Sequence, residues 1–329
     1  MNPLSVTIIV ICREVDAMTE FCIQETKKIY PEVLLLVVPD EIPSGKTIVY
    51  PGVDFFAVKG NMSIKRNRAV ERASSDYVAF LDNDAFPKKG WFESAVRILQ
   101  ENPEIGVVGG PNIGHPDEPQ DQRVVGNATR SFLVTGPFTY RKSIGKERNC
   151  HHLSSCNMVL RRSVFLAVGG MNELYYTSED MTLTDHLKKN GYLIRYHPEV
   201  FVYHKNRTLR GHFLQRFVWG LGAIPAFSET QRIDFVFYFA SAFFIALMVL
   251  GAALVPLMRW ERPYLGMLGI YLLVVLFEAV RTAGGRWGEL WKTFLAILAG
   301  NLGPGLGVWC YLFSIKIDRK KLYPQNVTP

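Results

Sequence analysis

The chain has 329 residues, of which 48% are hydrophobic, and carries a formal net charge of +7. This length is enough for one large domain or two smaller ones. The positive charge suits anionic lipid or phosphorylated ligands, and the lack of a basic-aromatic recognition motif argues against a nucleic-acid partner. Five cysteines, an odd number without a CxxC pair, favour reduced thiols over a disulfide framework.

The first 204 residues alternate between apolar runs and helical patterns. Apolar runs predict strands at 6–12, 33–38, 53–58, 77–81, 105–109, 155–162, 192–196 and 200–203. Helical spacing predicts helices at 16–30, 63–73, 91–102, 163–168 and 179–191. Continuous apolar strands separated by helices favour an α/β domain whose mostly parallel sheet is covered on both faces. Residues 111–148, rich in Gly and Pro, show no assignable pattern, and we interpret them as a long loop of the kind that often forms a functional lid.

Two acidic residues, Asp82 and Asp84, follow directly after the strand predicted at 77–81. In an extended segment residues i and i+2 point the same way, so both carboxylates can face one hard cation, Mg²⁺ or Mn²⁺. The carboxyl end of a strand in an open α/β sheet is also where ligands usually bind. The alternative is an Asp-rich turn, because Asp and Asn favour turns in any setting.

The helix predicted at 63–73 carries Lys65, Arg66 and Arg68 in its first turns, with Ser63 as its expected N-cap. Free backbone N–H groups, the helix dipole and basic side chains together suit a diphosphate. The alternative is a solvated amphipathic helix, which is what most charged helices are. No G-x-G-x-x-G motif and no Walker loop occurs, so the sequence gives no support for a dinucleotide or P-loop site.

A cluster of Cys150, His151, His152 and Cys156 raises the possibility of a zinc site. Their spacing matches no standard zinc signature, and residues on one strand would point in opposite directions. We therefore predict no zinc site from this cluster.

Two segments of this domain resemble inverting glycosyltransferases of family 2 with the GT-A fold. They are IKRNRAVERASSDYVAFLDNDAFPKKGW and CNMVLRRSVFLAVGGMNELYYTSEDMTLTDHLKKNGYLIRYHPEVFVYH, which together cover most of residues 60–204. An R-N helix, D-x-D, GG-M-N-E, an E-D helix and a terminal His follow one another in the family's order. The resemblance implies a Rossmann-like, mostly parallel sheet flanked by helices, and transfer of a sugar from a UDP- or GDP-sugar.

The resemblance also implies roles for single residues. Asp82 and Asp84 would hold the donor diphosphate through Mn²⁺ or Mg²⁺, with His204 close to the metal. Asp180 would be the general base, with Glu179 beside it, although acids in a first helical turn are also ordinary dipole-stabilising residues. The residues expected to bind substrate are Asp40 near the nucleobase, Lys65, Arg66 and Asp82 near the ribose and phosphates, and Asn157. Asp40 lies in VPDEIPSG, which departs from the family's V-D-D-x-S.

The segment 211–232 resembles the Q-x-x-R-W segment of membrane glycan synthases, which lies against acceptor and nucleotide. Gln215 and Trp219 fit this pattern, whereas Val218 stands where an Arg is expected, and Arg216 is the candidate replacement. The alternative is an amphipathic helix lying in the membrane interface.

Three apolar stretches follow, at 235–257, 264–280 and 290–315. The first has 23 residues without a charge and is long enough to span a bilayer. Gly300, Gly303, Pro304 and Gly305 are expected to break the third into two half-length helices. A re-entrant third segment would keep the basic tail on the cytosolic side, as the positive-inside rule favours.

The predicted organisation is a cytosolic catalytic domain at 1–210, an interfacial region at 211–232, membrane helices at 233–316 and a cytosolic tail at 317–329. We expect a cytoplasmic-membrane enzyme, in contact with membrane lipids, that transfers sugar to a lipid-linked saccharide or polyprenyl-phosphate carrier. A processive polysaccharide synthase is the alternative among enzymes, although few spanning segments are available for a translocating pore. A catalytically silent, membrane-bound nucleotide-sugar-binding scaffold is the alternative outside enzymes.

Overall fold

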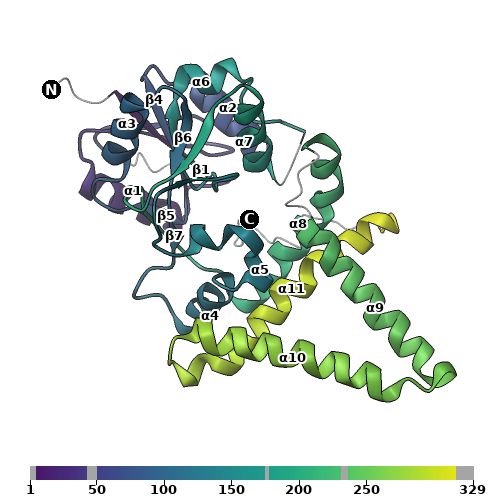
Figure 1. Cartoon of the computed structure of the whole chain (residues 1–329). Coiled ribbons are helices and arrows are strands. Elements are labelled where there is room, and N and C mark those ends of the chain that lie inside the picture. The colour runs from purple at the N-terminus through teal and green to yellow at the C-terminus, as the bar shows by residue number, and fades with distance from the viewer. Residues whose placement is uncertain (1–4, 43–49, 175–177, 231–235, 316–329) are drawn as a thin grey trace. The chain divides into compact units, whose positions relative to one another are not determined.

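The computed structural model describes residues 5–42, 50–174, 178–230 and 236–315 (Figure 1). The chain divides into two compact units: the first comprises residues 1–115 and 140–205, and the second residues 116–139 and 206–329. The boundary near 205 lies close to the expected one at 210. The expected division is wrong for 116–139, because this segment belongs to the C-terminal unit.

The first unit contains, among the described residues, a mixed sheet with the strand order β3-β2-β1-β4-β9-β6-β10-β8. All of its neighbouring strands pair in parallel except β9, which runs antiparallel to β4 and β6, and β8, which runs antiparallel to β10. The strands are β1 Val6–Ile11, β2 Leu34–Val38, β3 Val53–Phe55, β4 Tyr77–Asp82, β6 Ile105–Gly109, β8 Arg148–Asn149, β9 Asn157–Arg161 and β10 Leu193–Tyr196. A smaller sheet has the order β5-β11-β7, formed by Ala85–Pro87, Val202–His204 and Asn112–Ile113. The mostly parallel α/β fold is therefore confirmed.

Helices cover both faces of the large sheet, as β1 shows. Every residue of β1 is buried, with Ile8 and Val10 in one apolar cluster and Ile9 and Ile11 in the other. This alternation follows from the two-residue period of a strand, so a continuous apolar run indicates a strand buried on both sides. The helices of this unit are α1 Ala17–Ile29, α2 Met62–Arg72, α3 Trp91–Glu101, α6 Arg162–Ala167 and α7 Glu179–Lys189.

The start of α2 differs from the expectation. Asn61 is its N-cap, and the Asn61 side chain accepts a hydrogen bond from the Ile64 backbone N–H at 3.0 Å. Ser63, the expected cap, is fully buried in the first turn. The helix begins one residue earlier than predicted because Asn is as good a cap as Ser and stands at the right spacing.

The second unit is helical, and the expected loop at 111–148 is largely part of it. Residues 120–135 form α4 Gln120–Thr129 and α5 Phe132–Thr135, followed by the 3₁₀ turn η1 Gly136–Lys142. Val125, Ala128 and Val134 are buried in one apolar cluster with Ala279 and Ile297. The prediction of a lid loop is wrong because these apolar side chains pack onto helices distant in sequence, which stabilise short helices of weak intrinsic pattern.

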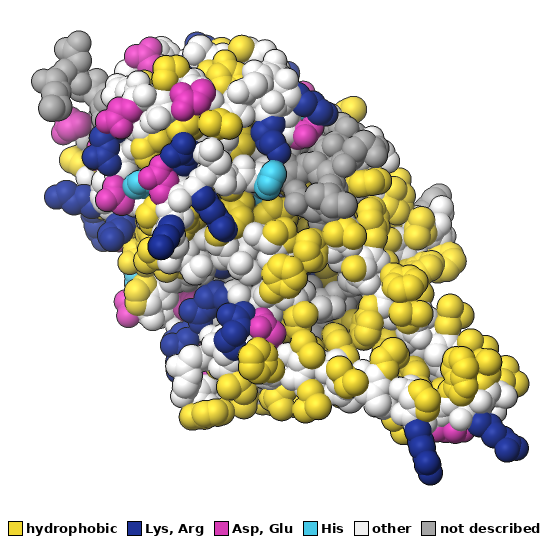
Figure 2. Space-filling view, in the orientation of Figure 1, with side chains coloured by type: hydrophobic (Ala, Val, Ile, Leu, Met, Phe, Trp, Pro, Cys, Tyr) yellow, Lys and Arg dark blue, Asp and Glu magenta, His cyan; other side chains and the backbone are white. Residues whose placement is uncertain are grey.

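In the described part of this unit, three further helices are long and apolar enough to cross a membrane. They are α9 Val236–Met258, α10 Glu261–Ala283 and the segment 287–312, which contains η3 Trp287–Glu289 and α11 Leu290–Leu312. Hydrophobic side chains crowd the surface where α9 and α10 extend from the rest of their unit (Figure 2). Only 11% of the most apolar window is buried in α9 and in α10, against 44% in the third helix, so α11 is the packing centre of the unit.

The expected break in the third segment is wrong, because α11 continues through Pro304. Its glycines allow close packing against α8 Leu209–Thr230. A Cβ at Gly307 would lie 2.1 Å from the Phe217 backbone oxygen, and one at Gly220 would lie 2.1 Å from the Pro304 backbone oxygen. Small residues that let helix backbones approach are typical of helix interfaces in membranes. The tail from 316 lies outside the described residues.

Candidate active site

Backbone pairing gathers four ligand-type side chains at the carboxyl end of β4. Asp82 is the last residue of β4, and the register Leu81↔Asn157 between β4 and β9 brings the following residue, Asp82, next to the preceding one, Cys156. In the small sheet His204 pairs with Ala85, directly after Asp84. Strand pairing, which joins distant parts of the chain, therefore concentrates two carboxylates, an imidazole and a thiol.

The distances within this group suit a divalent cation. The His204 Nε2 atom lies 3.3 Å from Asp84 Oδ1 and 3.8 Å from Asp82 Oδ2. One ligand atom each from Asp82, Cys156 and His204 lies within 4.8 Å of the other two. Carboxylate and imidazole donors fit Mn²⁺ and also Mg²⁺, although the thiol does not belong to the set that Mg²⁺ prefers. The structure thus brings together the three predicted ligands and adds Cys156, which the sequence analysis had considered only as part of a separate zinc cluster.

Arg66 connects these acids to the start of α7. Its guanidinium donates to Asp82 Oδ1 at 2.9 Å and to Glu179 Oε1 at 3.1 Å, and only 3% of the side chain is exposed. The basic residue comes from the first turns of α2, on the helix face that packs against the sheet. A single buried guanidinium therefore holds two carboxylates that are almost one hundred residues apart in sequence.

Lys65 and Asp40 form a second ion pair. The Lys65 ammonium lies 2.6 Å from Asp40 Oδ1 and also donates to the Cys12 backbone oxygen. The Lys65 side chain is 1% exposed, whereas that of Asp40 is 41% exposed. Lys65 thus fixes Asp40 just beyond the carboxyl ends of β1 and β2, where a ligand of an open sheet would bind. A direct contact of either residue with substrate stays a prediction.

Asp180 and Glu179 occupy the first turn of α7. Asp180 accepts hydrogen bonds from the Met181 N–H at 2.9 Å and the Ser155 N–H at 3.4 Å, and lies 3.6 Å from His152 Nε2. Burial and the adjacent Asp180 charge, opposed by Arg66, raise the pKa of the Glu179 carboxyl to about 7. Burial also raises the pKa of Asp180, against the charges of Arg141 and Arg66. A carboxylate whose pKa moves toward neutrality is suited to accept a proton.

Asn157, another predicted substrate residue, pairs with Leu81 of β4 and directly follows Cys156. Asn157 is 1% exposed, donates to the Pro111 and Val200 carbonyl oxygens, and accepts from the Trp91 indole N–H at 2.7 Å. These bonds use its whole amide, so the geometry favours a structural role, and substrate binding by Asn157 stays a prediction.

The other three predicted contacts, Gln215, Arg216 and Trp219, lie on α8 in the second unit. Arg216 donates to the Gly300 backbone oxygen at 3.1 Å and to the Val134 backbone oxygen, and its guanidinium lies 5.2 Å from the centroid of the Trp219 ring. These bonds join α8 to α5 and α11 within the unit. Contact of the three residues with substrate stays a prediction.

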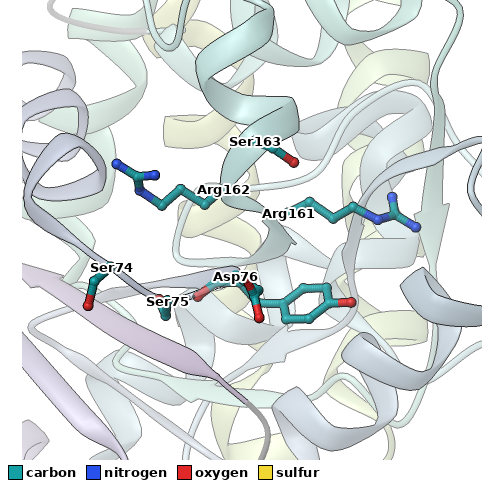
Figure 3. A pocket seen from close by; sticks show the side chains of 7 residues that line it. Ser74, Ser75, Asp76, Arg161, Arg162 and Ser163 are labelled. Atoms are coloured by element: carbon teal, nitrogen blue, oxygen red, sulfur yellow. Dashed lines mark hydrogen bonds between the residues drawn. The ribbon is translucent and has the colours of Figure 1, made fainter.

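A small depression of about 210 Å³ lies at the opposite end of β4 from Asp82 (Figure 3). Arg161 and Arg162 extend to opposite sides of it, and both donate to backbone carbonyl oxygens. Its cations are therefore engaged in holding the fold, and the depression is separate from the acidic site. The residues that line it are Ser74, Ser75, Asp76, Tyr77, Arg161, Arg162 and Ser163.

Comparison with known proteins finds similarity to glycosyltransferases. Residues 51–169 match the family model described as glycosyl transferase family 2. The chain is 30% identical over 161 residues to a pre-mycofactocin glycosyltransferase of Mycobacterium tuberculosis, covering 49% of this chain and 33% of that protein. It is 31% identical over 163 residues to the O-antigen chain rhamnosyltransferase WbaN of Salmonella anatum, covering 47% and 50%. The matches thus span between a third and a half of the length of these curated relatives.

A solved structure resembles nearly the whole fold. It is that of the mannosyltransferase PcManGT from Pyrobaculum calidifontis in complex with GDP-Man and Mn²⁺, with a TM-score of 0.59 and 16% sequence identity. The similarity covers 91% of this chain and 87% of that one. At this identity the likeness concerns the fold, and it confirms the predicted GT-A architecture.

Proposed function

We propose that the chain is an inverting glycosyltransferase that moves a sugar from a UDP- or GDP-sugar to a membrane lipid-linked acceptor. The reaction depends on a divalent metal. The proposal starts from the match of residues 51–169 to glycosyl transferase family 2. The observation that carries the proposal is the bridge made by Arg66, which joins the acids that end β4 to the acids that begin α7. Inverting glycosyl transfer that depends on a metal needs two acidic sites close in space, one to bind the metal and one to act as the base. Here the two sites come from parts of the chain that are distant in sequence.

The first acidic site serves the leaving group. Asp82, Asp84 and His204 would hold Mn²⁺ or Mg²⁺, which when bound supplies positive charge for the departing nucleoside diphosphate. Arg66 orients the Asp82 carboxylate through their 2.9 Å ion pair, which holds it in place at the end of β4. The Lys65–Asp40 pair would define the nucleoside end of the donor site.

The second acidic site serves the acceptor. Asp180 would take the proton from the attacking hydroxyl as the oxygen bonds to the anomeric carbon from the face opposite the diphosphate. Backbone N–H groups of Ser155 and Met181 hold its two oxygens in a fixed orientation. Glu179, tied to Arg66, would keep the start of α7 aligned with the end of β4.

The acceptor class is supported by the second unit. Among the described residues, three helices are long and apolar enough to cross a bilayer, which would hold the enzyme at a membrane where a lipid-linked acceptor is found. A polyprenyl-phosphate or polyprenyl-diphosphate saccharide at the cytosolic face of the cytoplasmic membrane has both the lipid tail and the polar group that this combination suits.

The proposal is tested by transfer assays on the purified full chain with a panel of UDP- and GDP-sugars. We expect transfer to a polyprenyl-phosphate-linked saccharide that stops on chelation and returns with Mn²⁺ or Mg²⁺. Equal rates on the lipid-linked saccharide and on its free glycan would reject the acceptor class. Full activity in excess chelator would reject the metal. A scaffold without catalytic function would bind nucleotide-sugar and show neither transfer nor hydrolysis.

A further inference from the structure

Cys156 places a thiol among the ligand atoms of the acidic site. It directly precedes β9, is 1% exposed, and offers its Sγ atom within 4.8 Å of a carboxylate oxygen of Asp82 and a ring nitrogen of His204. The three residues come from different elements, so their proximity is a property of the tertiary structure. We propose that Cys156 is a ligand of the bound cation together with Asp82 and His204, and that the site therefore prefers Co²⁺ or Zn²⁺ to Mg²⁺. This inference rests on the proposed metal-dependent function.

The surroundings of the sulfur support a metal-bound thiolate. The Asn112 amide nitrogen donates to Cys156 Sγ at 3.0 Å, which stabilises negative charge on sulfur. Asn112 is only 4% exposed, and its amide oxygen has no hydrogen-bond partner among the described residues. A buried polar oxygen beside the thiol, left without a partner, is the kind of group that an ion or its bound water would satisfy.

Ligation by this thiol requires the loss of its proton. Binding breaks the S–H bond, forms the sulfur–metal bond and releases one proton to solvent, with no change of oxidation state.

The preference follows from the chemistry of the ligand. Thiolate is a soft ligand that binds Zn²⁺ and Co²⁺ well, whereas Mg²⁺ takes oxygen ligands and keeps much of its water. A site made only from Asp82, Asp84 and His204 would lack the part of the preference for Zn²⁺ and Co²⁺ over Mg²⁺ that a thiolate ligand supplies. Because the His204 imidazole also favours these cations over Mg²⁺, a sulfur-specific signal and its loss in a Cys156 variant are what report whether the thiol takes part.

The experiment is a titration of the full chain, purified in detergent and stripped of metal, with Co²⁺ alone. We expect a near-ultraviolet sulfur-to-cobalt charge-transfer band that Zn²⁺ abolishes and excess Mg²⁺ leaves unchanged. Cys156→Ser should lose the band and bind Co²⁺ about 10- to 100-fold more weakly or worse. Loss of a residue that only hydrogen-bonds a metal ligand already costs about that much affinity. Cys150→Ser is the matched control and should keep both.

Each outcome decides the matter. A charge-transfer band that survives in Cys156→Ser, or Co²⁺ binding by the wild type without any band, overturns the inference. If Asp82→Asn abolishes Co²⁺ binding while Cys156→Ser does not weaken it, the inference fails but the proposed metal site stands. A wild-type chain that binds no Co²⁺ overturns both. Should the Ser variant fail to fold, Cys156→Ala gives the same test.

Discussion

The acidic site and the helical unit each contain a buried ionic cluster, with the charges reversed. In the first unit one guanidinium, that of Arg66, lies between two carboxylates. In the second unit one carboxylate, that of Glu289, accepts hydrogen bonds from Arg123 Nε at 2.7 Å, Asn127 Nδ2 at 3.0 Å and Arg286 Nε at 3.1 Å.

The comparison distinguishes a cluster with a purely structural role, around Glu289, from one that belongs to the candidate active site, around Arg66. Only 5% of the Glu289 side chain is exposed, and its two oxygens accept three donors, so nothing further is needed to satisfy it. Beyond the two carboxylates that Arg66 binds, the site also holds Asp84, 3.3 Å from His204 Nε2, and Asp180, which lies 3.6 Å from His152 Nε2. Excess buried negative charge is costly unless a cation is bound or a proton is taken up, and both belong to the proposed chemistry.

The largest effect is expected on the acid that the proposed chemistry requires as a base. Asp180→Asn should lower kcat by about 10²- to 10⁴-fold, the usual contribution of general base catalysis, and leave the affinity for nucleotide-sugar nearly unchanged. Initial rates and equilibrium binding measure the two effects. Asp185→Asn, in the same helix and paired with Lys189, is the matched control and should retain activity. Comparable losses in both variants would mean that the helix, and not the base, was disturbed.

The ionic bridge of the first unit is tested by Arg66→Gln. Removing one partner of a buried ion pair typically costs about 3–5 kcal/mol, and here two carboxylates lose their cation. We expect a lower midpoint of thermal unfolding and reduced activity. Arg68→Gln is the control, because its side chain is 45% exposed and pairs on the surface with Glu71. Unchanged unfolding of Arg66→Gln would contradict the bridge.

The ionic cluster of the helical unit is tested by Glu289→Gln, which leaves two guanidinium groups without a counter-charge. We expect a loss of about 3 kcal/mol in the free energy of unfolding and faster hydrogen exchange in residues 116–139, which this cluster ties to the helices. Exposed Glu261→Gln is the control. Metal affinity should stay at the wild-type level, and a drop in it would show that the two clusters do not act separately.

Helix packing in the second unit gives a smaller effect. Gly307→Ala would place a methyl group 2.1 Å from the Phe217 backbone oxygen, and overpacking of this kind costs about 1–3 kcal/mol. Gly266→Ala on α10 meets no atom within 4 Å and should be neutral or slightly stabilising, since Ala favours helix over Gly by about 1 kcal/mol. Thermal unfolding of the two variants in the same detergent compares them directly. Equal midpoints would argue against the close contact of α8 and α11.

The smallest effect concerns pH. Because the pKa values of Glu179 and Asp180 are both raised, the carboxylate forms appear only at higher pH than for free acids. The logarithm of kcat/KM should therefore fall as the pH drops. The apparent pKa of this acid limb should lie above 3.8, the ordinary pKa of aspartic acid. Removing the Arg66 charge should move this limb to higher pH. A limb at or below 3.8 in the wild type would contradict a base in a buried site.

The sequence by itself was enough to predict most strands and helices of the first unit and the acids at the end of β4, although it missed the short strands β5, β7 and β8. Such features depend on local periodicity and on the two-residue repeat of an extended chain, which need no partner. The order of the short motifs that contain Asp82, Asp84, Asp180 and His204 can likewise be recognised in the sequence without the structure.

Only the tertiary structure decided which side chains meet. Cys156 joins the acidic site because β9 pairs antiparallel to β4, and His152 reaches Asp180 from a different segment; neither contact leaves a local signal in the sequence. Residues 116–139 become helical, and Gly300 to Gly307 remain so, because packing against distant helices outweighs intrinsic propensity. In an isolated segment glycine disfavours a helix. Between two packed helices, however, glycine allows their backbones to approach closely.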